Sequence, residues 1–220
     1  MRIFIGWDSR ETMAGRVLEW SIRRHATVPV TFVRLSLGLV RELGVRLRDR
    51  PGSTEFTYSR FLVPHLCGYE GRALFLDCDM LCFADVRELD ELPMDGCALK
   101  VVQHDYRPAE TTKMDGQAQV LYPRKNWSSC MLMDCSKLRC WSPEAVANWH
   151  GGWLHRFYDV PDAAIGRLDP NWNELERRKP ETKILHYTQW NPWMNPGRHP
   201  DESLWLDARR EMLREAVDGR

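Results

Sequence analysis

The chain has 220 residues, of which 43% are hydrophobic, with 14 glycines and 13 prolines. This composition is typical of one globular domain and not of a disordered or fibrous chain. Lysine and arginine together number 31, as do aspartate and glutamate, so the formal net charge is zero. Because no overall positive field attracts a polyanion, we expect no nucleic-acid partner.

Neither a targeting segment nor a membrane span is expected. The first apolar run meets Asp8 after about five residues, which is shorter than a signal-peptide core. No window approaches the ~18 uninterrupted apolar residues of a membrane-spanning helix. The seven cysteines form an odd set without a C-x-x-C pair, which argues against a disulfide framework or a zinc site. We therefore expect buried thiols in a cytoplasmic protein with no transmembrane segment.

Apolar patterns predict strands that alternate with helices. In chain order, the expected elements are a strand over 2–7, a helix over 11–25, a strand over 30–35, a helix over 58–66 that Pro64 kinks or ends, strands over 73–76, 97–102, 130–133 and 184–186, and an amphipathic helix over 202–217. The all-apolar run 73–76 is typical of a strand that is buried on both faces of a mainly parallel sheet. The alternation predicts a single α/β domain over 1–220.

The polar stretch from 103 to 129 is too long for an ordinary connection between two strands. One interpretation is a solvated insertion. Our preferred hypothesis is that it folds over a substrate as lids do when water must be excluded.

Several common catalytic motifs are missing. The sequence has no G-x-G, no lysine that follows a glycine, no G-x-S-x-G and no H-E-x-x-H. These absences argue against the usual dinucleotide oxidoreductases, P-loop NTPases, typical α/β-hydrolases and zincins.

The candidate chemistry centres on Asp77 and Asp79, which follow the 73–76 strand. Alternate residues of an extended segment share a face, so both carboxylates are expected on one side, with Cys78 on the other. Carboxylate oxygens suit Mg²⁺ or Mn²⁺, although the same tripeptide also occurs as a turn or a helix cap. Two enzyme classes place D-x-D after an apolar strand: haloacid-dehalogenase-like phosphatases, and glycosyltransferases that hold a cation against a nucleotide-sugar. Leu81 stands where the phosphatase motif usually has Thr or Val.

The segments around this pair resemble glycosyltransferase family 8 and its bacterial relatives, in which an arginine-bearing helix precedes the D-x-D strand. The matching pieces, in the order of the family, are 3–8, 53–64, 73–80, 128–132 and 184–188. Together they extend over most of the chain. The resemblance implies a single GT-A (Rossmann-like) α/β domain with a mainly parallel central sheet and helices on both faces.

The resemblance also implies roles for individual residues. Metal ligands are expected at Asp77, Asp79 and His186. Contacts with the bound nucleotide-sugar are expected at Asp8, which would meet the nucleobase, at Arg60, near the diphosphate or sugar, and at Gly6, Cys78, Lys113, Ser128 and Ser129. Asp162 stands roughly where the family has a carboxylate beside the donor sugar. It could stabilise an oxocarbenium-like transition state or cap a helix.

The sequence departs from the family pattern at two places. Asn191 stands where many members have a lysine that touches the diphosphate, and Lys113, Arg124 or Lys125 could supply that charge. Ser128 and Ser129 replace part of the family's Asn-Ala-Gly segment.

These features predict a glycosyltransferase of polysaccharide biosynthesis that depends on Mn²⁺ or Mg²⁺. A hexosyl or deoxyhexosyl group would pass from a UDP-sugar to a saccharide or lipid-linked saccharide acceptor, with retention of configuration by analogy with the family. Two alternatives remain: a D-x-D phosphatase, and a catalytically silent domain that binds a nucleotide or sugar.

Overall fold

The computed structural model describes residues 1–47, 52–105 and 123–219. The strands are β1 (Arg2–Gly6), β2 (Thr31–Leu35), β3 (Arg72–Leu76), β4 (Met80–Cys82), β5 (Leu99–Val101), β6 (Cys130–Asp134), β7 (Ile165–Arg167), β8 (Glu174–Leu175) and β9 (Ile184–His186). The α-helices are α1 (Thr12–His25), α2 (Leu37–Glu42), α3 (Val63–Leu66), α4 (Arg87–Asp90), α5 (Pro143–Asn148), α6 (Gly151–His155) and α7 (Glu202–Val217).

A six-stranded sheet forms the centre of the fold, with the strand order β2-β1-β3-β6-β5-β7. Its strands run parallel to one another except β6, which is antiparallel to both β3 and β5. Ile5 of β1 lies opposite Leu76 of β3, so the carboxyl ends of these strands meet at one edge. The predicted mainly parallel sheet is confirmed, and this edge holds the residues that follow both strands.

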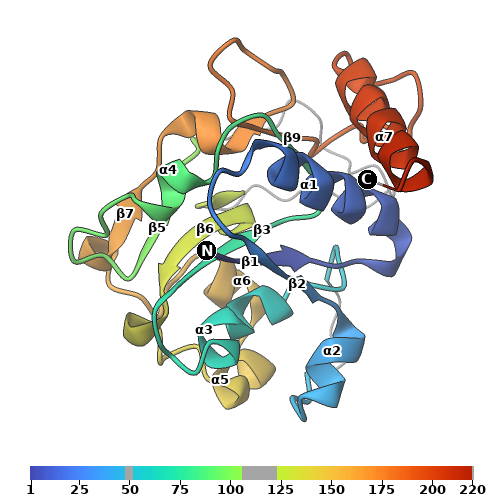
Figure 1. Ribbon diagram of the computed structural model, residues 1–220. Coiled ribbons are helices and arrows are strands. Elements are labelled where there is room, and N and C mark those ends of the chain that lie inside the picture. The colour runs from blue at the N-terminus through green and yellow to red at the C-terminus, as the bar shows by residue number, and fades with distance from the viewer. Residues whose placement is uncertain (48–51, 106–122, 220) are drawn as a thin grey trace.

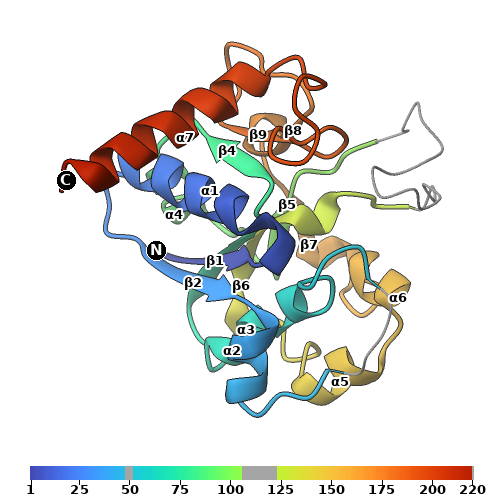
Figure 2. The ribbon, with the colours of Figure 1, turned by 90° about the vertical axis from the view of Figure 1, so that its right-hand side faces the viewer.

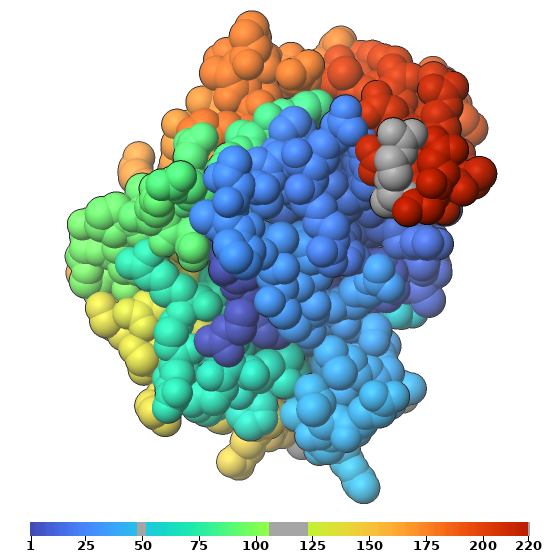
Figure 3. Space-filling view, viewed as in Figure 1, coloured from blue at the N-terminus to red at the C-terminus, as the bar shows by residue number. Residues whose placement is uncertain are grey.

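Helices cover both faces of the central sheet, as predicted (Figures 1 and 2). Helix α1 lies on one face with α7 beside it, whereas α3, α5 and α6 lie on the other. The space-filling view shows the surfaces of α1 and α7 in contact (Figure 3). Trp20 donates a 2.6 Å hydrogen bond to Glu215, and Arg24 forms ion pairs of 3.2 Å with Glu211 and Glu215. The C-terminal helix is thus anchored on the first helix.

A second, smaller sheet was not anticipated. It has the order β4-β9-β8, with β9 antiparallel to β4 and parallel to β8. The 184–186 strand therefore belongs to this sheet and not to the central one. Its register places His186 opposite Met80, which brings the histidine to the residues just after β3.

The predicted helix over 58–66 is divided into two short pieces. A 3-10 helix over Ser59–Leu62 leads directly into α3. Pro64 lies in the first turn of α3, where the missing N–H of proline costs no helical hydrogen bond. This division sets the direction of the segment that carries Arg60.

The core is built from the central sheet and the aromatic side chains beneath it. Phe61 packs edge-to-face on Trp141 and on Phe157, and all three are fully buried. All seven cysteines are unpaired; five are buried and two are partly exposed, so the expectation of buried thiols holds for five. Within the described ranges, no helix combines the length and apolar character that crossing a membrane requires.

Candidate metal and donor site

Three of the predicted residues come together at the carboxyl edge of the central sheet. One ligand atom from each of Asp77, Asp79 and His186 lies within 4.8 Å of the other two. Nε2 of His186 is 3.1 Å from Oδ1 of Asp79. Among the described residues, this trio is the cluster of His, Cys, Asp or Glu side chains that lie close enough together to hold one metal ion. A constellation predicted from segments more than 100 residues apart in the sequence is thus assembled in space.

Main-chain hydrogen bonds hold the two aspartates in place. The amide of Asp77 donates to the carbonyl of Ser129 at 2.9 Å, which continues the β3–β6 pairing by one residue. The amide of Tyr187 donates to the carbonyl of Asp79, also at 2.9 Å. The aspartate pair is therefore fixed on one side by the central sheet and on the other by the small sheet.

Arg60 is a buried partner of Asp77. Its Nη1 lies 2.7 Å from Oδ1 of Asp77 and 2.9 Å from the carbonyl of Ser128, while Nε donates to the carbonyl of Phe56 at 3.3 Å. The guanidinium lies 5.1 Å from the ring centroids of both Phe56 and Phe75. Burial raises the pKa of Asp77 to about 7, although the charge of Arg60 opposes that rise.

Asn173 determines how His186 presents its ring. Nδ1 of His186 lies 2.9 Å from Oδ1 of Asn173, whose Nδ2 donates to Ser129 Oγ at 2.9 Å and to the carbonyl of Asn126 at 3.3 Å. Because the amide oxygen is an acceptor, the ring proton belongs on Nδ1, and Nε2 faces Asp79 with its lone pair. Burial lowers the pKa of His186, but the carboxylates of Asp79 and Asp77 outweigh it, so the net shift is upward.

The lone pair of Nε2 and Oδ1 of Asp79 repel each other unless a cation or a proton lies between them. Oδ1 of Asp79 is buried, and apart from the imidazole of His186 no group of the described chain offers it a hydrogen bond. Two carboxylates and an imidazole match the donor atoms that Mn²⁺ accepts. The donor set therefore fits a divalent cation.

Glu11 adds a further carboxyl group that sequence reasoning missed. It lies in the 3-10 helix Ser9–Glu11, and its Oε2 is 4.0 Å from the sulfur of Cys78. Burial, with the charges of Asp79 and Asp8, raises the pKa of Glu11 to about 8. Cys78 is 1% exposed and belongs to the core, and its predicted contact with a nucleotide-sugar stays a prediction. No motif marks Glu11 or Asn173, and only the fold brings them to the site.

Asp8 is held by hydrogen bonds from its own chain. It is completely buried, and its carboxylate accepts hydrogen bonds from the main chain and guanidinium of Arg10 and from the amide of Glu55. Burial raises its pKa, but these hydrogen bonds outweigh that effect and hold the pKa below its usual range. Donors of the same chain therefore occupy the carboxylate of Asp8, and its contact with a nucleobase stays a prediction.

Gly6 serves packing in this structure. A Cβ at Gly6 would lie 2.6 Å from Cγ of Phe56, well inside van der Waals contact. The ring of Phe56 in turn faces the guanidinium of Arg60. The glycine thus lets the segment that carries Arg60 approach the end of β1.

The remaining predicted residues take different positions. Ser128 is 5% exposed and its Oγ lies 2.7 Å from Nδ1 of His155, while Ser129 Oγ donates to the carbonyl of Asn126 at 2.6 Å. The side chain of Asp162 is 83% exposed and forms a 2.6 Å ion pair with Arg124. Lys113 lies outside the described residues, as does most of the predicted lid.

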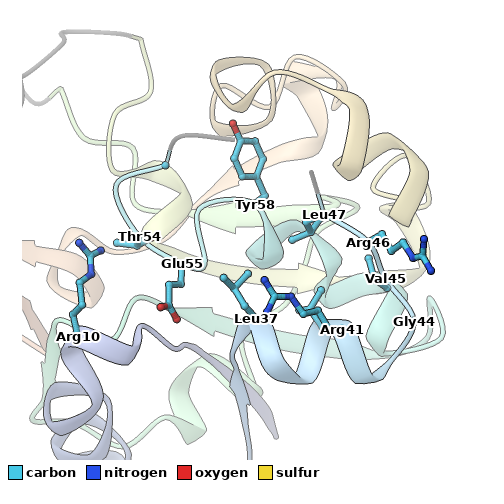
Figure 4. Close-up of a pocket in the computed structure, with 12 residues that line it drawn as sticks. Arg10, Leu37, Arg41, Gly44, Val45, Arg46, Leu47, Thr54, Glu55 and Tyr58 are labelled. Atoms are coloured by element: carbon cyan, nitrogen blue, oxygen red, sulfur yellow. The ribbon is translucent and has the colours of Figure 1, made fainter. Parts of the chain in front are cut away.

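A cavity of about 850 Å³ adjoins the end of β1 (Figure 4). It lies between α2 and the chain around Thr54 and Tyr58. Its described lining residues are Arg10, Leu37, Val40, Arg41, Gly44, Val45, Arg46, Leu47, Gly52, Thr54, Glu55 and Tyr58. The side of α2 is thus mainly apolar but carries Arg41 and Arg46, and the other side carries charged, polar and aromatic side chains.

Solved structures with a similar fold are glycosyltransferases. The galactosyltransferase LgtC superposes with a TM-score of 0.64 at 13% identity, with 96% of each chain covered. GlyE of Streptococcus pneumoniae gives 0.62 at 15% identity and covers 99% of this chain; the chain spans 63% of GlyE. No family model matches the sequence. The fold is that of the GT-A glycosyltransferases, as the sequence predicted.

A much closer relative exists at the level of sequence. Protein CDI of Arabidopsis thaliana is 43% identical over 227 aligned positions, which cover 97% of this chain and 88% of CDI. The chain belongs to the family of protein CDI.

Proposed function

We propose that the protein is a metal-dependent glycosyltransferase. It transfers a hexosyl or deoxyhexosyl group from a nucleoside diphosphate donor, a UDP-sugar, to a saccharide or lipid-linked saccharide acceptor in polysaccharide biosynthesis. The observation that carries this proposal is the convergence of Asp77, Asp79 and His186 within 4.8 Å at the carboxyl edge of a GT-A sheet. In open α/β sheets, ligands bind at this edge. LgtC has been solved in complex with donor and acceptor sugar analogues, which supports such a reaction.

Asp77, Asp79 and His186 would hold Mn²⁺ or Mg²⁺. The bound ion would neutralise charge on the departing diphosphate, which removes the need for a protein acid at that position. Arg60 keeps Asp77 in place, and Asn173 orients His186.

Other residues are proposed to act on the donor sugar. Asp162 projects a carboxylate into solvent beside Arg124, and a carboxylate at the sugar would stabilise positive charge that develops at its anomeric carbon. Lys113, Ser128 and Ser129 are proposed as further donor contacts. Retention of configuration remains a proposal by analogy.

The seven unpaired cysteines support a cytoplasmic location, where thiols stay reduced. This compartment agrees with a nucleotide-sugar donor and is proposed together with it.

A nucleotide titration tests the function directly. UDP is titrated calorimetrically into the protein with Mn²⁺, and again with a chelator. We expect binding only with the metal, and its loss in Asp79→Asn. Asp207→Asn is the matched control, because Asp207 is a surface carboxylate whose side chain is 58% exposed. No UDP binding by the wild-type protein with either Mn²⁺ or Mg²⁺ would contradict the proposal.

Turnover separates the proposal from its two alternatives. Release of UDP from a UDP-sugar in the presence of Mn²⁺ indicates a transferase that uses water as a slow acceptor. Binding without any turnover across a panel of UDP-sugars would identify a silent binding domain. Hydrolysis of p-nitrophenyl phosphate that is abolished in Asp77→Asn would identify a phosphatase.

A further inference from the structure

The carboxylate of Asp8 is fully occupied by its own protein. Oδ1 accepts from the main-chain N of Arg10 at 2.9 Å and from Nε of Arg10 at 3.0 Å. Oδ2 accepts from Nη2 of Arg10 at 2.7 Å and from the amide of Glu55 at 3.1 Å. An ionised carboxylate offers about four lone-pair sites. A ligand could bind to Asp8 only by displacing one of these donors.

These hydrogen bonds fix the guanidinium of Arg10 in one orientation. Nε and Nη2 both bind Asp8, and Nη2 also donates to the carbonyl of Ser53 at 3.0 Å. Nη1 donates to no residue of the described chain. The side chain of Arg10 is 55% exposed, whereas that of Asp8 is completely buried. The group that the end of β1 presents to solvent is therefore the guanidinium and not the carboxylate.

Arg10 lines the 850 Å³ cavity, and its guanidinium lies beside Thr54 (Figure 4). The opposite wall comes from α2 and the chain after it, and the ring of Tyr58 adds an aromatic surface. That wall combines the apolar residues Leu37, Val40, Val45 and Leu47 with the arginines Arg41 and Arg46. Arg10 follows β1 and Leu37 follows β2, so the cavity lies beyond the carboxyl ends of two parallel strands. Its size and mixed walls suit a flat, partly polar ring such as a nucleobase.

We propose that Arg10 is the residue that recognises the donor nucleobase, which lodges in this cavity, and that Asp8 is a positioning residue that makes no contact with it. Nη1 of Arg10 donates to a carbonyl oxygen on the base. This inference rests on the proposed function, because it names the part of the donor that the cavity receives. Uracil carries such carbonyl oxygens and adenine carries none. Arg10 therefore favours UDP over ADP.

Nucleotide affinities test the assignment. The dissociation constants of UDP and ADP are measured with Mn²⁺ for the wild-type protein, Arg10→Ala and Arg23→Ala. One charge-assisted hydrogen bond corresponds to about 10- to 100-fold in affinity. We therefore expect Arg10→Ala to raise the dissociation constant of UDP by that factor and to leave that of ADP unchanged. Arg23→Ala is the matched control, because Arg23 is also 55% exposed and pairs with a carboxylate, Glu19, outside the cavity. UDP binding by Arg10→Ala within twofold of wild type, or equal losses for UDP and ADP, would overturn the assignment.

A double-mutant cycle tests the role of Asp8. If Asp8 acts only through Arg10, the variant with both Asp8→Asn and Arg10→Ala binds UDP no more weakly than Arg10→Ala alone. Additive losses would show that Asp8 contacts the ligand itself. Arg10→Lys is measured in parallel, because it keeps a cation beside Asp8 but lacks the planar fork. We expect it to keep the thermal midpoint of the wild-type protein and to lose the preference for UDP; an unchanged preference would overturn the proposal.

The two proposals fail in different ways. Wild-type protein that binds no UDP with Mn²⁺ contradicts the proposed function. Wild-type protein that binds UDP, together with Arg10 variants that bind it equally well, contradicts only the assignment of Arg10.

Discussion

Oδ1 of Asn173 lies 2.9 Å from Nδ1 of His186, and both side chains are buried. The amide of Asn173 in turn donates to Ser129, which lies next to the antiparallel strand of the central sheet. The histidine is therefore oriented by the central sheet although it belongs to the small one. Hydrogen-bonded partners of this kind fix the tautomer and the direction of a metal ligand.

Replacement of Asn173 tests that orientation. We expect Asn173→Ala to lower the affinity for Mn²⁺ by about 10- to 100-fold, the usual cost of losing such a partner, because the ring of His186 loses its acceptor. Asn173→Asp retains an acceptor oxygen and should bind Mn²⁺ more tightly than Asn173→Ala. The measurement is a Mn²⁺ titration followed by electron paramagnetic resonance. Equal affinities in Asn173→Ala and wild type would show that Asn173 does not orient the ligand.

Arg60 is predicted to stabilise the fold through Asp77. Their 2.7 Å ion pair is largely buried, with side-chain exposures of 6% and 14%. Arg60→Met leaves a buried carboxylate without its cation, which costs about 3–5 kcal/mol of unfolding free energy. Urea unfolding at neutral pH measures this loss. Arg210→Met, which breaks the exposed pair with Asp207, is the control and should cost about 0–1 kcal/mol.

The pH dependence gives an independent check on the Arg60 variant. Burial already raises the pKa of Asp77 to about 7, and Arg60 is the group that opposes this rise. Without Arg60 the pKa rises further, so the folded variant holds a proton that the unfolded chain releases at lower pH. The wild-type carboxyl takes up its own proton near pH 7, so the deficit in stability should shrink as the pH falls toward about 7 from above and stay level below it. A deficit that stays constant from about pH 9 to pH 7 would contradict the assigned interaction.

Gly6 is predicted to be essential for packing. The Cβ of alanine would lie 2.6 Å from Cγ of the buried Phe56 ring, which must then shift away from Arg60. Overpacking of a tight core typically costs about 1–3 kcal/mol. We expect Gly6→Ala to lose stability in urea unfolding and Phe56→Leu to restore part of the loss in the double variant. Losses that simply add in the double variant would show that the two positions are independent.

Much of the fold could be predicted because its signals are local. The apolar run of β3 and the 3.6-residue pattern of α7 depend on nearby residues, and α7 spans the predicted 202–217 range. The small sheet could not be predicted, since β4 has three residues and β8 has two, too few for any periodicity. Its existence decides where His186 lies.

The site was predictable only in part, for a related reason. Asp77 and Asp79 stand in a motif, whereas Asn173 and Glu11 reach the site through tertiary packing. Asp8 was expected to meet a nucleobase because the segment 3–8 resembles the first strand of glycosyltransferase family 8. Its occupation by Arg10 depends on the turn between them and on the amide of Glu55, a contact 47 residues away in sequence. Hydrogen bonds between residues so far apart in the sequence produce no pattern that can be recognised in the sequence.

His104 is half-buried, and Nε2 of its ring is buried. Nε2 of His104 has no hydrogen-bond partner in the described ranges, and its carbonyl accepts from Trp127 Nε1 at 3.0 Å. Burial lowers the pKa of His104 to about 4, and the charge of His186 acts in the same direction. Histidine in an unfolded chain titrates near 6.5. Between these two values the unfolded chain binds more protons than the folded protein, so stability is lost as the pH falls.

Removing the imidazole should make the protein less sensitive to acid in that window. We expect the unfolding free energy of His104→Gln to fall less steeply than that of wild type between pH 6.5 and pH 4, by up to about 1.4 kcal/mol per pH unit for one proton. Urea unfolding in metal-free buffer at several pH values measures both slopes. Above pH 7 the two slopes should coincide, because His104 is then neutral in both states. Parallel slopes throughout the acidic window would show that His104 titrates alike in the folded and unfolded protein.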